Sequence, residues 1–590
     1  MSEKALENEQ LFAGIGVSNG TAYGKVFVVA HTSAQIPEYN VSDSQIDGEI
    51  KRFEQALMKT RTDIVSLKEE LAQKVGDKES SIFDAHLLVL EDVAIISETY
   101  SNLQDTKRNI EICYIEVVNR FLQAFEEIDD PFMRERIADI RDVSRRMINN
   151  LMGHEEKSSL NLGEPAILAS KDFTPSDFAF VDKTKVLGII TEKGSLTSHT
   201  AILARSLRVP CIVGINIEET NLKSGDVILI DGYKGNLFVN PSGDTLKKYT
   251  EIANIRREIE RIFDSSLPYP SETTDFHKVS LEFNIGSASD IKEGSMAYSD
   301  GIGLFRTEAL FIDKGNFMDE DSQFEAYKAA VIKAEGKPVT IRTLDLGGDK
   351  TLAFKNEFGH EENPFMGYRA IRFCLDRVDI FTAQLKAILR AGVYGKVRIL
   401  YPMISGINEL VRANSVLEQA KLALKNEGIE YSSDIEIGTM IEVPSAAMII
   451  DLIAKHCDFI SIGTNDLIQY LLAVDRVNDH VAHLYNPANP AVIRMLDKIV
   501  SEGKKANLKV SVCGEIAADP IFAMLLIGMG VDSLSMASGA LSEIKFMLRK
   551  ASFEELRKLR NDALSQNCSR DILTILRRFR NAKMKEFIQI

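Results

Sequence analysis

The chain has few of the features that mark secreted or membrane proteins. Its six cysteines are scattered through 590 residues without a CxxC pair, a spacing that favours free thiols in a reducing compartment over disulfides. It contains no run of about 18 apolar residues, so we expect no membrane-spanning helix. The N-terminus has no basic segment followed by an apolar stretch, and we therefore expect no signal peptide. These absences predict a cytoplasmic protein without membrane insertion.

The chain also has fewer positively charged than negatively charged residues. The 70 Lys and Arg residues are outnumbered by 86 Asp and Glu residues, which gives a net charge of −16. Such a surface repels nucleic acid and anionic lipid, so no nucleic-acid partner is expected. A site for a phosphate-bearing ligand must then be a local cluster of arginines and lysines. Hydrophobic residues make up 45% of the chain, and its length predicts about three or four domains of ~150 residues.

The N-terminal part alternates between strand-like and helical patterns. Residues 10–30 have the composition of two short strands. From about 42 to 153 the pattern is helical, and apolar residues at three- and four-residue spacing from Ile46 to Leu71 predict a seam between helices. Short strands return between 164 and 240 with one helix among them. We interpret this order as one α/β domain interrupted by an all-α insertion.

The C-terminal half repeats short apolar strands with helical patterns between several of them. The strands are SLEFNIG, GIGLF, VTIRTLD, VRILYPM, IGTMIEV, FISIGT, KVSVCG and DSLSMA. Eight such strands predict a closed (β/α)₈ barrel. The rival, a doubly wound open sheet, is disfavoured by this count and by the absence of a Gly-rich dinucleotide loop after the first strand. The predicted organisation is multidomain α/β, with an α/β domain over 1–41 and 154–241, an inserted helical subdomain over 42–153, a helical connector over 242–270 and a TIM barrel over 271–590.

Polar residues collect at the ends of the predicted barrel strands, where barrel enzymes place their sites. They are Arg306, Arg342, Glu442, Asn465, Asp466, Arg476 and Cys513. Arginine forks bind carboxylate and phosphate, and the oxygens of Glu442 and Asp466 suit Mg²⁺. Ordinary salt bridges remain the alternative for any single residue, and a strand cysteine is more often core packing than chemistry. The whole set at one rim favours a small polyanionic substrate, with a metal ion to neutralise its charge.

A second candidate is His199, within Thr197-Ser198-His199-Thr200 at the start of a predicted helix. Ser or Thr would cap the helix. The free N–H groups of a helix start disfavour imidazolium, so the ring stays neutral and nucleophilic at pH 7. The same groups welcome a phosphoryl group once it arrives. A structural histidine near a cap is the alternative on these residues alone.

The sequence resembles the PEP-utilising enzymes, a family that uses phosphoenolpyruvate. The stretch GSLTSHTAILARSLRVPCIVG is similar to their phosphohistidine loop. Successive motifs of their barrel follow in order: GIGLFRTE, IRTLDLGGDK, NPFMGYRAIR, MIEVP, SIGTNDLIQY and HLYNPANPAVIRM. The insertion, with IFDAHLLVLEDVAI and RERIADIRDVSRR, resembles only the branch that serves the bacterial sugar phosphotransferase system. The match runs from about residue 10 to about residue 575.

The resemblance implies a phosphoenolpyruvate-protein phosphotransferase. It implies that His199 is phosphorylated by phosphoenolpyruvate, and that the insertion docks the carrier protein HPr, which receives the phosphoryl group in the first step of sugar uptake. The implied roles at the barrel are substrate binding by Arg306, Arg342, Asn465, Asp466 and Arg476, Mg²⁺ binding by Glu442 and Asp466, and protonation of the enolate by Cys513. A homodimer formed through the barrel is implied as well.

Two departures and two rival functions accompany this resemblance. Ser195-Leu196 stands where the family usually has Gly-Arg, and Val477 replaces a usual Gly after Arg476. Both departures put the transfer rate in doubt.

A pyruvate or water dikinase would need a nucleotide-binding domain, for which the sequence has no Gly-rich region. A regulatory, non-catalytic relative that binds HPr-like partners is disfavoured because every catalytic residue type is present, although the Leu196 change keeps it open.

Overall fold

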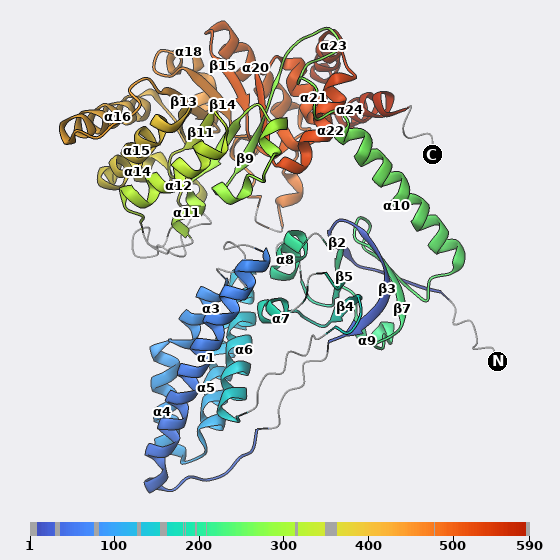
Figure 1. Ribbon diagram of the computed structural model, residues 1–590, viewed down its shortest axis with the longest axis vertical. Coiled ribbons are helices and arrows are strands. Elements are labelled where there is room, and N and C mark those ends of the chain that lie inside the picture. Colours follow the sequence, from blue (N-terminus) through green and yellow to red (C-terminus); the bar gives the residue numbers. More distant parts are fainter. Residues whose placement is uncertain are drawn as a thin grey trace. The chain divides into compact units, whose positions relative to one another are not determined.

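The computed structural model (Figure 1) divides the chain into two compact units, Met1–Asn254 and Ile255–Ile590. The described residues are 9–29, 36–75, 82–126, 131–153, 162–180, 182, 184–194, 198–207, 209–312, 317–347, 361, 363–476, 478 and 480–585.

The first unit contains an eight-stranded mixed sheet in the order β1-β8-β7-β3-β4-β5-β6-β2. Its strands are β1 (Gln10–Ala13), β2 (Ile15–Ser18), β3 (Thr21–Val28), β4 (Ala166–Ser170), β5 (Val186–Thr191), β6 (Cys211–Val213), β7 (Val227–Asp231) and β8 (Asn236–Val239). β1 and β2 are consecutive in the chain but lie at opposite edges of the sheet. The Gly14 N–H between them donates to the Gly235 carbonyl at 2.8 Å. A Cβ on Gly16 would lie 2.1 Å from the Gly232 oxygen, so only glycine allows this close approach of β2 to the turn between β7 and β8.

In the part of the chain between β3 and β4, the described helices run side by side (Figure 1). They are α1 (Ile46–Val75), α3 (Ile82–Leu90), α4 (Val93–Thr106), α5 (Ile110–Glu126) and α6 (Pro131–Leu151). The predicted seam on α1 is buried at Phe53, Ile64, Leu67 and Leu71. The helical stretch IFDAHLLVLEDVAII is divided in two, because the Asp92 side chain accepts the first N–H groups of α4 as its N-cap.

One hydrophobic core joins these helices to one face of the sheet. Phe53 of α1 belongs to the same buried cluster as Leu168, Ile189 and Cys211 of the strands. The alternate strand residues, among them Ile167, form a second core on the other face. The short helices α7 (Pro175–Phe180) and α9 (Ile217–Thr220) and the longer α8 (His199–Leu207) complete the unit. The helical bundle and the sheet therefore share packing.

The second unit contains a closed parallel barrel of eight strands, in the order β10 to β16 with β9 closing it. They are β9 (Ser280–Ile285), β10 (Ile302–Arg306), β11 (Val339–Arg342), β12 (Val397–Tyr401), β13 (Glu436–Ile441), β14 (Phe459–Ile462), β15 (Lys509–Val512) and β16 (Ser533–Met536). Each overlaps one of the eight predicted strands, with β10 ending one residue beyond GIGLF, at Arg306, and β13 beginning one residue before IGTMIEV, at Glu436. The predicted multidomain α/β fold with a C-terminal TIM barrel is confirmed.

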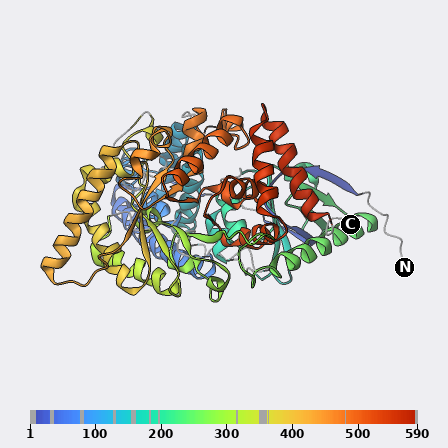
Figure 2. The ribbon, with the colours of Figure 1, turned by 90° about the horizontal axis from the view of Figure 1, so that it is seen from above.

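Helices surround these strands (Figure 2). They are α11 (Glu308–Ile312), α12 (Glu320–Lys333), α14 (Ile371–Asp376), α15 (Val378–Ala391), α16 (Ile407–Glu427), α17 (Pro444–Met448), α18 (Ile450–Ile453), α19 (Thr464–Leu472), α20 (Pro490–Lys505), α21 (Pro520–Met529), α22 (Leu541–Arg549), α23 (Phe553–Leu564) and α24 (Ser569–Met584). Helix α10 (Gly243–Asp264) leads into the unit, where its Phe263 packs against Phe546. No helix among the described residues is long and apolar enough to cross a membrane.

The barrel strands alternate between two environments. On β14, Ile460 and Ile462 belong to the large core shared with the outer helices, whereas Phe459 does not. Phe459 instead forms a small cluster with Leu304, Leu400, Met440 and Cys513, contributed by four other parts of the barrel. Because strand side chains alternate, this cluster marks the barrel interior just below the strand ends that carry the candidate site.

Candidate active site

Arg342, the last residue of β11, is held between two carboxylates. Its Nη2 donates to Glu308 Oε1 at 2.5 Å, and its Nη1 lies 3.1 Å from Asp345 Oδ2. All three side chains are at most 8% exposed. Burial alone would lower the pKa of Arg342, but Glu308 and Asp345 outweigh it and raise that pKa. The guanidinium therefore stays charged at the barrel rim and is fixed in direction.

Arg369 is a second buried guanidinium, which the strand-end prediction did not include. Its Nη2 lies 2.8 Å from Asp345 Oδ1 and 3.3 Å from Asp466 Oδ2, and its Nη1 donates to the Tyr470 hydroxyl at 3.3 Å. A Cβ on Gly347, whose φ is +124°, would come within 2.1 Å of the Arg369 Cβ. Glycine at this position thus lets the loop bring Arg369 to the rim.

Arg476 and Arg306 differ in their partners. Arg476 Nη1 lies 3.0 Å from Asp466 Oδ1, and its backbone N–H donates to Gln469 Oε1. Arg306 ends β10, is exposed, and forms no ion pair with any residue that the structure describes. Three of the four rim arginines are thus tied to carboxylates, and Arg306 is left for an anionic ligand.

Glu442 follows β13 and is 2% exposed. Its Oε1 accepts the Met403 N–H at 2.6 Å, and its other oxygen accepts no hydrogen bond from a described residue. Burial, with the neighbouring Asp466 and Asp345 charges, raises the pKa of Glu442 to about 8. A carboxylate with a spare oxygen, close to two others, fits a hard divalent cation, which would remove this repulsion.

The metal site would be built from few protein ligands. Within the described ranges, no group of three or more Asp, Glu, His or Cys side chains has the geometry to hold a metal. Asp466 is now engaged by Arg369 and Arg476, so it would have to exchange an arginine for the cation. A hard divalent cation that keeps several waters, and binds one or two carboxylates together with a phosphate of the ligand, would suit such a site.

Asn465 is fixed by a reciprocal pair of hydrogen bonds with Glu515. Its Nδ2 donates to Glu515 Oε1 at 3.2 Å, and the Glu515 N–H donates to Asn465 Oδ1 at 3.0 Å. This pair connects the start of α19 with the loop after β15. Cys513, on the same loop, is 3% exposed and accepts a hydrogen bond from the Ser461 hydroxyl at 3.2 Å. The strand-end residues predicted from the sequence thus meet at one rim.

In the first unit, His199 is the first residue of α8. The preceding Ser198 caps this helix, since its Oγ accepts the Ala201 N–H at 3.4 Å. The Thr200 hydroxyl donates to the Phe173 carbonyl at 3.4 Å and ties the helix start to a neighbouring loop. The His199 side chain lies outside the described residues, as do Ser195, Leu196 and Val477. The helix-start position predicted for His199 is confirmed for its backbone.

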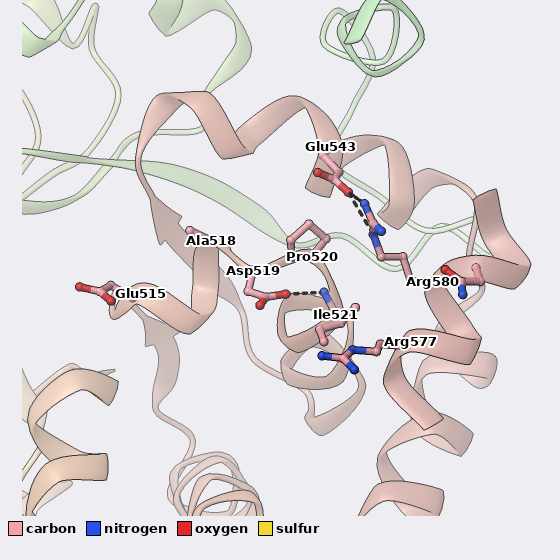
Figure 3. A pocket seen from close by; sticks show the side chains of 9 residues that line it. Glu515, Ala518, Asp519, Pro520, Ile521, Glu543, Arg577 and Arg580 are labelled. Atoms are coloured by element: carbon pink, nitrogen blue, oxygen red, sulfur yellow. Dashed lines mark hydrogen bonds and ion pairs between the residues drawn. The ribbon is translucent and has the colours of Figure 1, made fainter. Parts of the chain in front are cut away.

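A separate pocket of about 520 Å³ lies beside the rim (Figure 3). Its charged lining residues are Glu515, Asp519, Glu543, Arg577 and Arg580. Arg580 is paired with Glu543 at 2.7 Å, and the Asp519 carboxylate accepts the Ile521 N–H. Because carboxylates outnumber guanidiniums here, this pocket is a poor match for a trianion. The rim with its four arginines remains the candidate site.

The site includes residues that carry no strand-end signal. Arg369 and Tyr470 lie on a loop and within a helix, and Glu308 opens α11. Arg369 occurs in NPFMGYRAIR, one of the motifs that carry the family resemblance. That motif is the only sequence signal that pointed toward it.

The chain is similar to known proteins over most of its length. The model of the PEP-binding domain of PEP-utilising enzymes matches residues 264–553, that of their N-terminal domain 13–136 and that of their mobile domain 162–235. The phosphoenolpyruvate-protein phosphotransferase of Listeria monocytogenes is 37% identical over 566 residues, which cover 96% of this chain and 98% of that protein. That of Bacillus subtilis is 37% identical over 568 residues, with 96% and 99% covered.

A solved NMR structure of Enzyme I (nEIt) is 33% identical, covers 40% of this chain and 96% of its own, and has a TM-score of 0.35. The curated relatives match nearly end to end, and the three family models follow one another in the expected places. The chain therefore belongs to the family of PEP-utilising enzymes, in the group of the phosphoenolpyruvate-protein phosphotransferases.

Proposed function

We propose that this protein is a cytoplasmic enzyme that takes the phosphoryl group of phosphoenolpyruvate onto His199, releases pyruvate, and passes the group to the carrier protein HPr. The observation that carries the proposal is the barrel rim, where four guanidiniums and several buried carboxylates meet at the carboxyl ends of the strands. The end-to-end similarity to phosphoenolpyruvate-protein phosphotransferases supports the same reaction. Sugar uptake is the process that such a transfer would serve.

Each of the rim residues binds a different part of the substrate. Arg306 has no carboxylate partner among the described residues, so its guanidinium meets the phosphate or the carboxylate of phosphoenolpyruvate. Arg342 is oriented by Glu308 and Asp345 and binds a second anionic oxygen. Asn465 and Arg476 complete the clamp. Holding the substrate in one orientation relative to the phosphoryl acceptor removes much of the entropic cost of the transfer.

Glu442 and Asp466 would hold a divalent metal ion, which enzymes of this family use, and we propose that the ion is Mg²⁺. When bound, Mg²⁺ neutralises charge on the transferring phosphoryl group. The two residues supply hard oxygen ligands from neighbouring strand ends, and Asp466 also fixes Arg369 and Arg476. Cys513 supplies the proton that converts the enolate into pyruvate.

The first unit carries the phosphoryl acceptor and, in this proposal, the partner surface. The start of α8, which Ser198 caps, is the positive end of a helix dipole and favours a phosphoryl group at His199. HPr docks on the helical insertion, where large apolar side chains are exposed at Met58, Leu88 and Val93. Exposed apolar groups of this kind mark protein-binding surfaces when they lie together. The barrel of the second unit forms the contact of a homodimer.

The test of the proposal is phosphorylation from radiolabelled phosphoenolpyruvate in the presence of Mg²⁺. The wild-type protein should acquire an acid-labile label, and His199→Ala should acquire none. His456→Ala is the matched control, because His456 is exposed on the second unit and should label as the wild type does. Undiminished labelling of His199→Ala, or an unlabelled wild type, would contradict the proposal.

A further inference from the structure

The thiol of Cys513 lies in an apolar layer inside the barrel. The other members of this layer are Leu304, Leu400, Met440 and Phe459. Burial raises the pKa of the Cys513 thiol, although the Ser461 hydroxyl and the Arg342 charge oppose it. A thiol kept protonated is what proton donation requires. The thiolate that remains after donation, however, is the form that an apolar layer disfavours.

Ser461 supplies a hydroxyl to this thiol. Its Oγ lies 3.2 Å from Cys513 Sγ, and the two side chains are 1% and 3% exposed. Ser461 is on β14, which pairs with β15 immediately before Cys513. Among the residues that the structure describes, the thiol donates only to the Ile462 carbonyl, at 3.7 Å. The S–H proton is thus held weakly, while the sulfur already accepts a hydrogen bond.

The backbone of Cys513 is fixed independently of Ser461. Its N–H donates to the Ile462 carbonyl at 3.2 Å, and its carbonyl accepts from Asn284 Nδ2 at 3.1 Å. Asn284 is held in turn by the Ser535 hydroxyl at 2.6 Å. With the main chain anchored to β14 and to β9, the hydrogen bond from Ser461 helps to set the direction of the side chain. Among the described residues, no other group donates to this sulfur.

We propose that Ser461 is a positioning residue that aims the Cys513 thiol and stabilises its thiolate, an inference that rests on the proposed function. After phosphoryl transfer, C3 of the pyruvate enolate takes the thiol proton. The S–H bond breaks, the electron pair of the enolate double bond forms the C3–H bond, and the enolate oxygen becomes the ketone of pyruvate. The S–H electron pair stays on sulfur, where the Ser461 hydroxyl already donates. Solvent returns the proton to the thiolate before the next turnover.

A purely structural serine makes a different prediction. If Ser461 only fills space in the barrel, its loss changes stability and leaves the acidity of Cys513 unchanged. The test therefore measures the thiol directly, by thiolate ultraviolet absorbance against pH. The same titration of a Cys513→Ala variant is subtracted in each background, so that a single thiol is followed. The rate at which the C3 protons of pyruvate exchange with D₂O, with Mg²⁺ present, is the second readout.

The variants form matched sets. Ser461→Ala removes the hydroxyl, Ser461→Thr keeps it, and Ser461→Val has the shape of threonine without it. Ser461→Val also serves if the alanine variant does not fold. Ser511→Ala is the control, because Ser511 lies on the adjacent strand β15 and its hydroxyl donates to the Ile460 carbonyl at 3.2 Å rather than to the thiol.

Loss of a hydrogen bond to a charged group should move the Cys513 titration upward by about one pH unit or more and slow the exchange about tenfold. Ser461→Thr should restore both values, and Ser511→Ala should match the wild type. The charged groups that face the thiol, Arg306, Arg342 and Glu442, are the same in every variant. The proposal is overturned if Cys513 titrates in Ser461→Ala as it does in the wild type. It is also overturned if Ser461→Thr restores the titration and the exchange rate no better than Ser461→Val does.

The two readouts separate this proposal from the proposed function. The absorbance titration requires no turnover, so it tests the contact between Ser461 and Cys513 in any folded protein. A wild type that takes no label from phosphoenolpyruvate would contradict the proposed function, whatever the titration shows. A labelled wild type with an unchanged Ser461→Ala titration would contradict only the role of Ser461.

Discussion

At the scale of single residues, the rim is built from balanced charges. Arg342, Arg369 and Arg476 are each paired with a carboxylate, and Arg306 alone is unpaired among the described rim arginines. Buried arginines need such partners, because an isolated charge is costly to remove from water. The same pairing leaves little spare positive charge for a trianionic substrate. In the proposed function a bound cation supplies the remaining counter-charge, and its proposed ligand Asp466 also pairs with Arg369 and Arg476.

This arrangement predicts a metal phenotype for Asp466→Asn. The substitution keeps the size of the side chain but removes the charge that would bind the cation. We expect the Mg²⁺ concentration for half-maximal labelling to rise about tenfold to a hundredfold, or labelling to be lost. Asp451→Asn is the control, because Asp451 is exposed on α18 and should not change the titration. An unchanged Mg²⁺ requirement in Asp466→Asn would refute the ligand assignment.

The sequence predicted part of this site for a physical reason. Parallel strands in a barrel end at one rim, so polar residues after Phe305 and Ile441 had to meet there, and Arg306 and Glu442 do. Arg369 could not be found in this way, because it lies far along the chain from the end of β11, just before α14. Its position depends on a close approach to Gly347, which strand periodicity does not reveal.

At the scale of elements, the strands were predictable because each is short, apolar and bounded by turns. Helix boundaries were less predictable, because the break between α3 and α4 depends on a single N-cap residue, Asp92. The barrel also contains a buried acidic residue that the sequence patterns did not indicate. Glu282, in the middle of β9, is 5% exposed, and its Oε1 lies 3.9 Å from Arg398 Nη1. Burial raises the pKa of Glu282 to about 7.

This raised pKa predicts a pH-dependent cost to stability. The folded state binds the Glu282 proton more tightly than the unfolded state, so the free energy of unfolding falls as pH rises from about 4.5 to about 7. Glu282→Gln removes the titration. We expect it to raise the free energy of unfolding at pH 8 by roughly 2–3 kcal/mol relative to the wild type, and by little near pH 4. Thermal unfolding of the full chain at several pH values measures the difference.

Glu436→Gln is the matched control for this prediction. Glu436 pairs with the same arginine, with Arg398 Nε 2.6 Å from its Oε2, but its side chain is 45% exposed. An exposed pair of this kind contributes about 1 kcal/mol or less. Its loss should lower stability slightly and leave the pH dependence as it is in the wild type. A Glu282→Gln variant with the wild-type pH dependence would show that the buried carboxyl does not titrate as expected.

At the scale of the whole molecule, each unit has a hydrophobic core of its own. The first unit, Met1–Asn254, contains the two cores on either face of its sheet. The second unit has the barrel core, which includes Phe263 of α10, with Ile259 and Ile262 packed against it. The proposed chemistry divides in the same way. The phosphoryl acceptor and the partner surface belong to the first unit, and the substrate and metal residues belong to the second.

This division predicts that each unit folds and performs half of the reaction alone. A fragment of residues 1–254 ends before Ile259, so it exposes none of the α10 side chains that pack on the barrel. It should accept phosphate from phosphorylated HPr, because that step needs only His199 and the helical docking surface, but take none from phosphoenolpyruvate. The complementary fragment, residues 255–590, should bind phosphoenolpyruvate in a metal-dependent manner, measurable by calorimetry, and remain unlabelled. The His199→Ala version of the first fragment is the control and should accept no phosphate. If the first fragment is folded by circular dichroism but cannot be labelled by phosphorylated HPr, then the acceptor and the partner surface do not both lie in this unit.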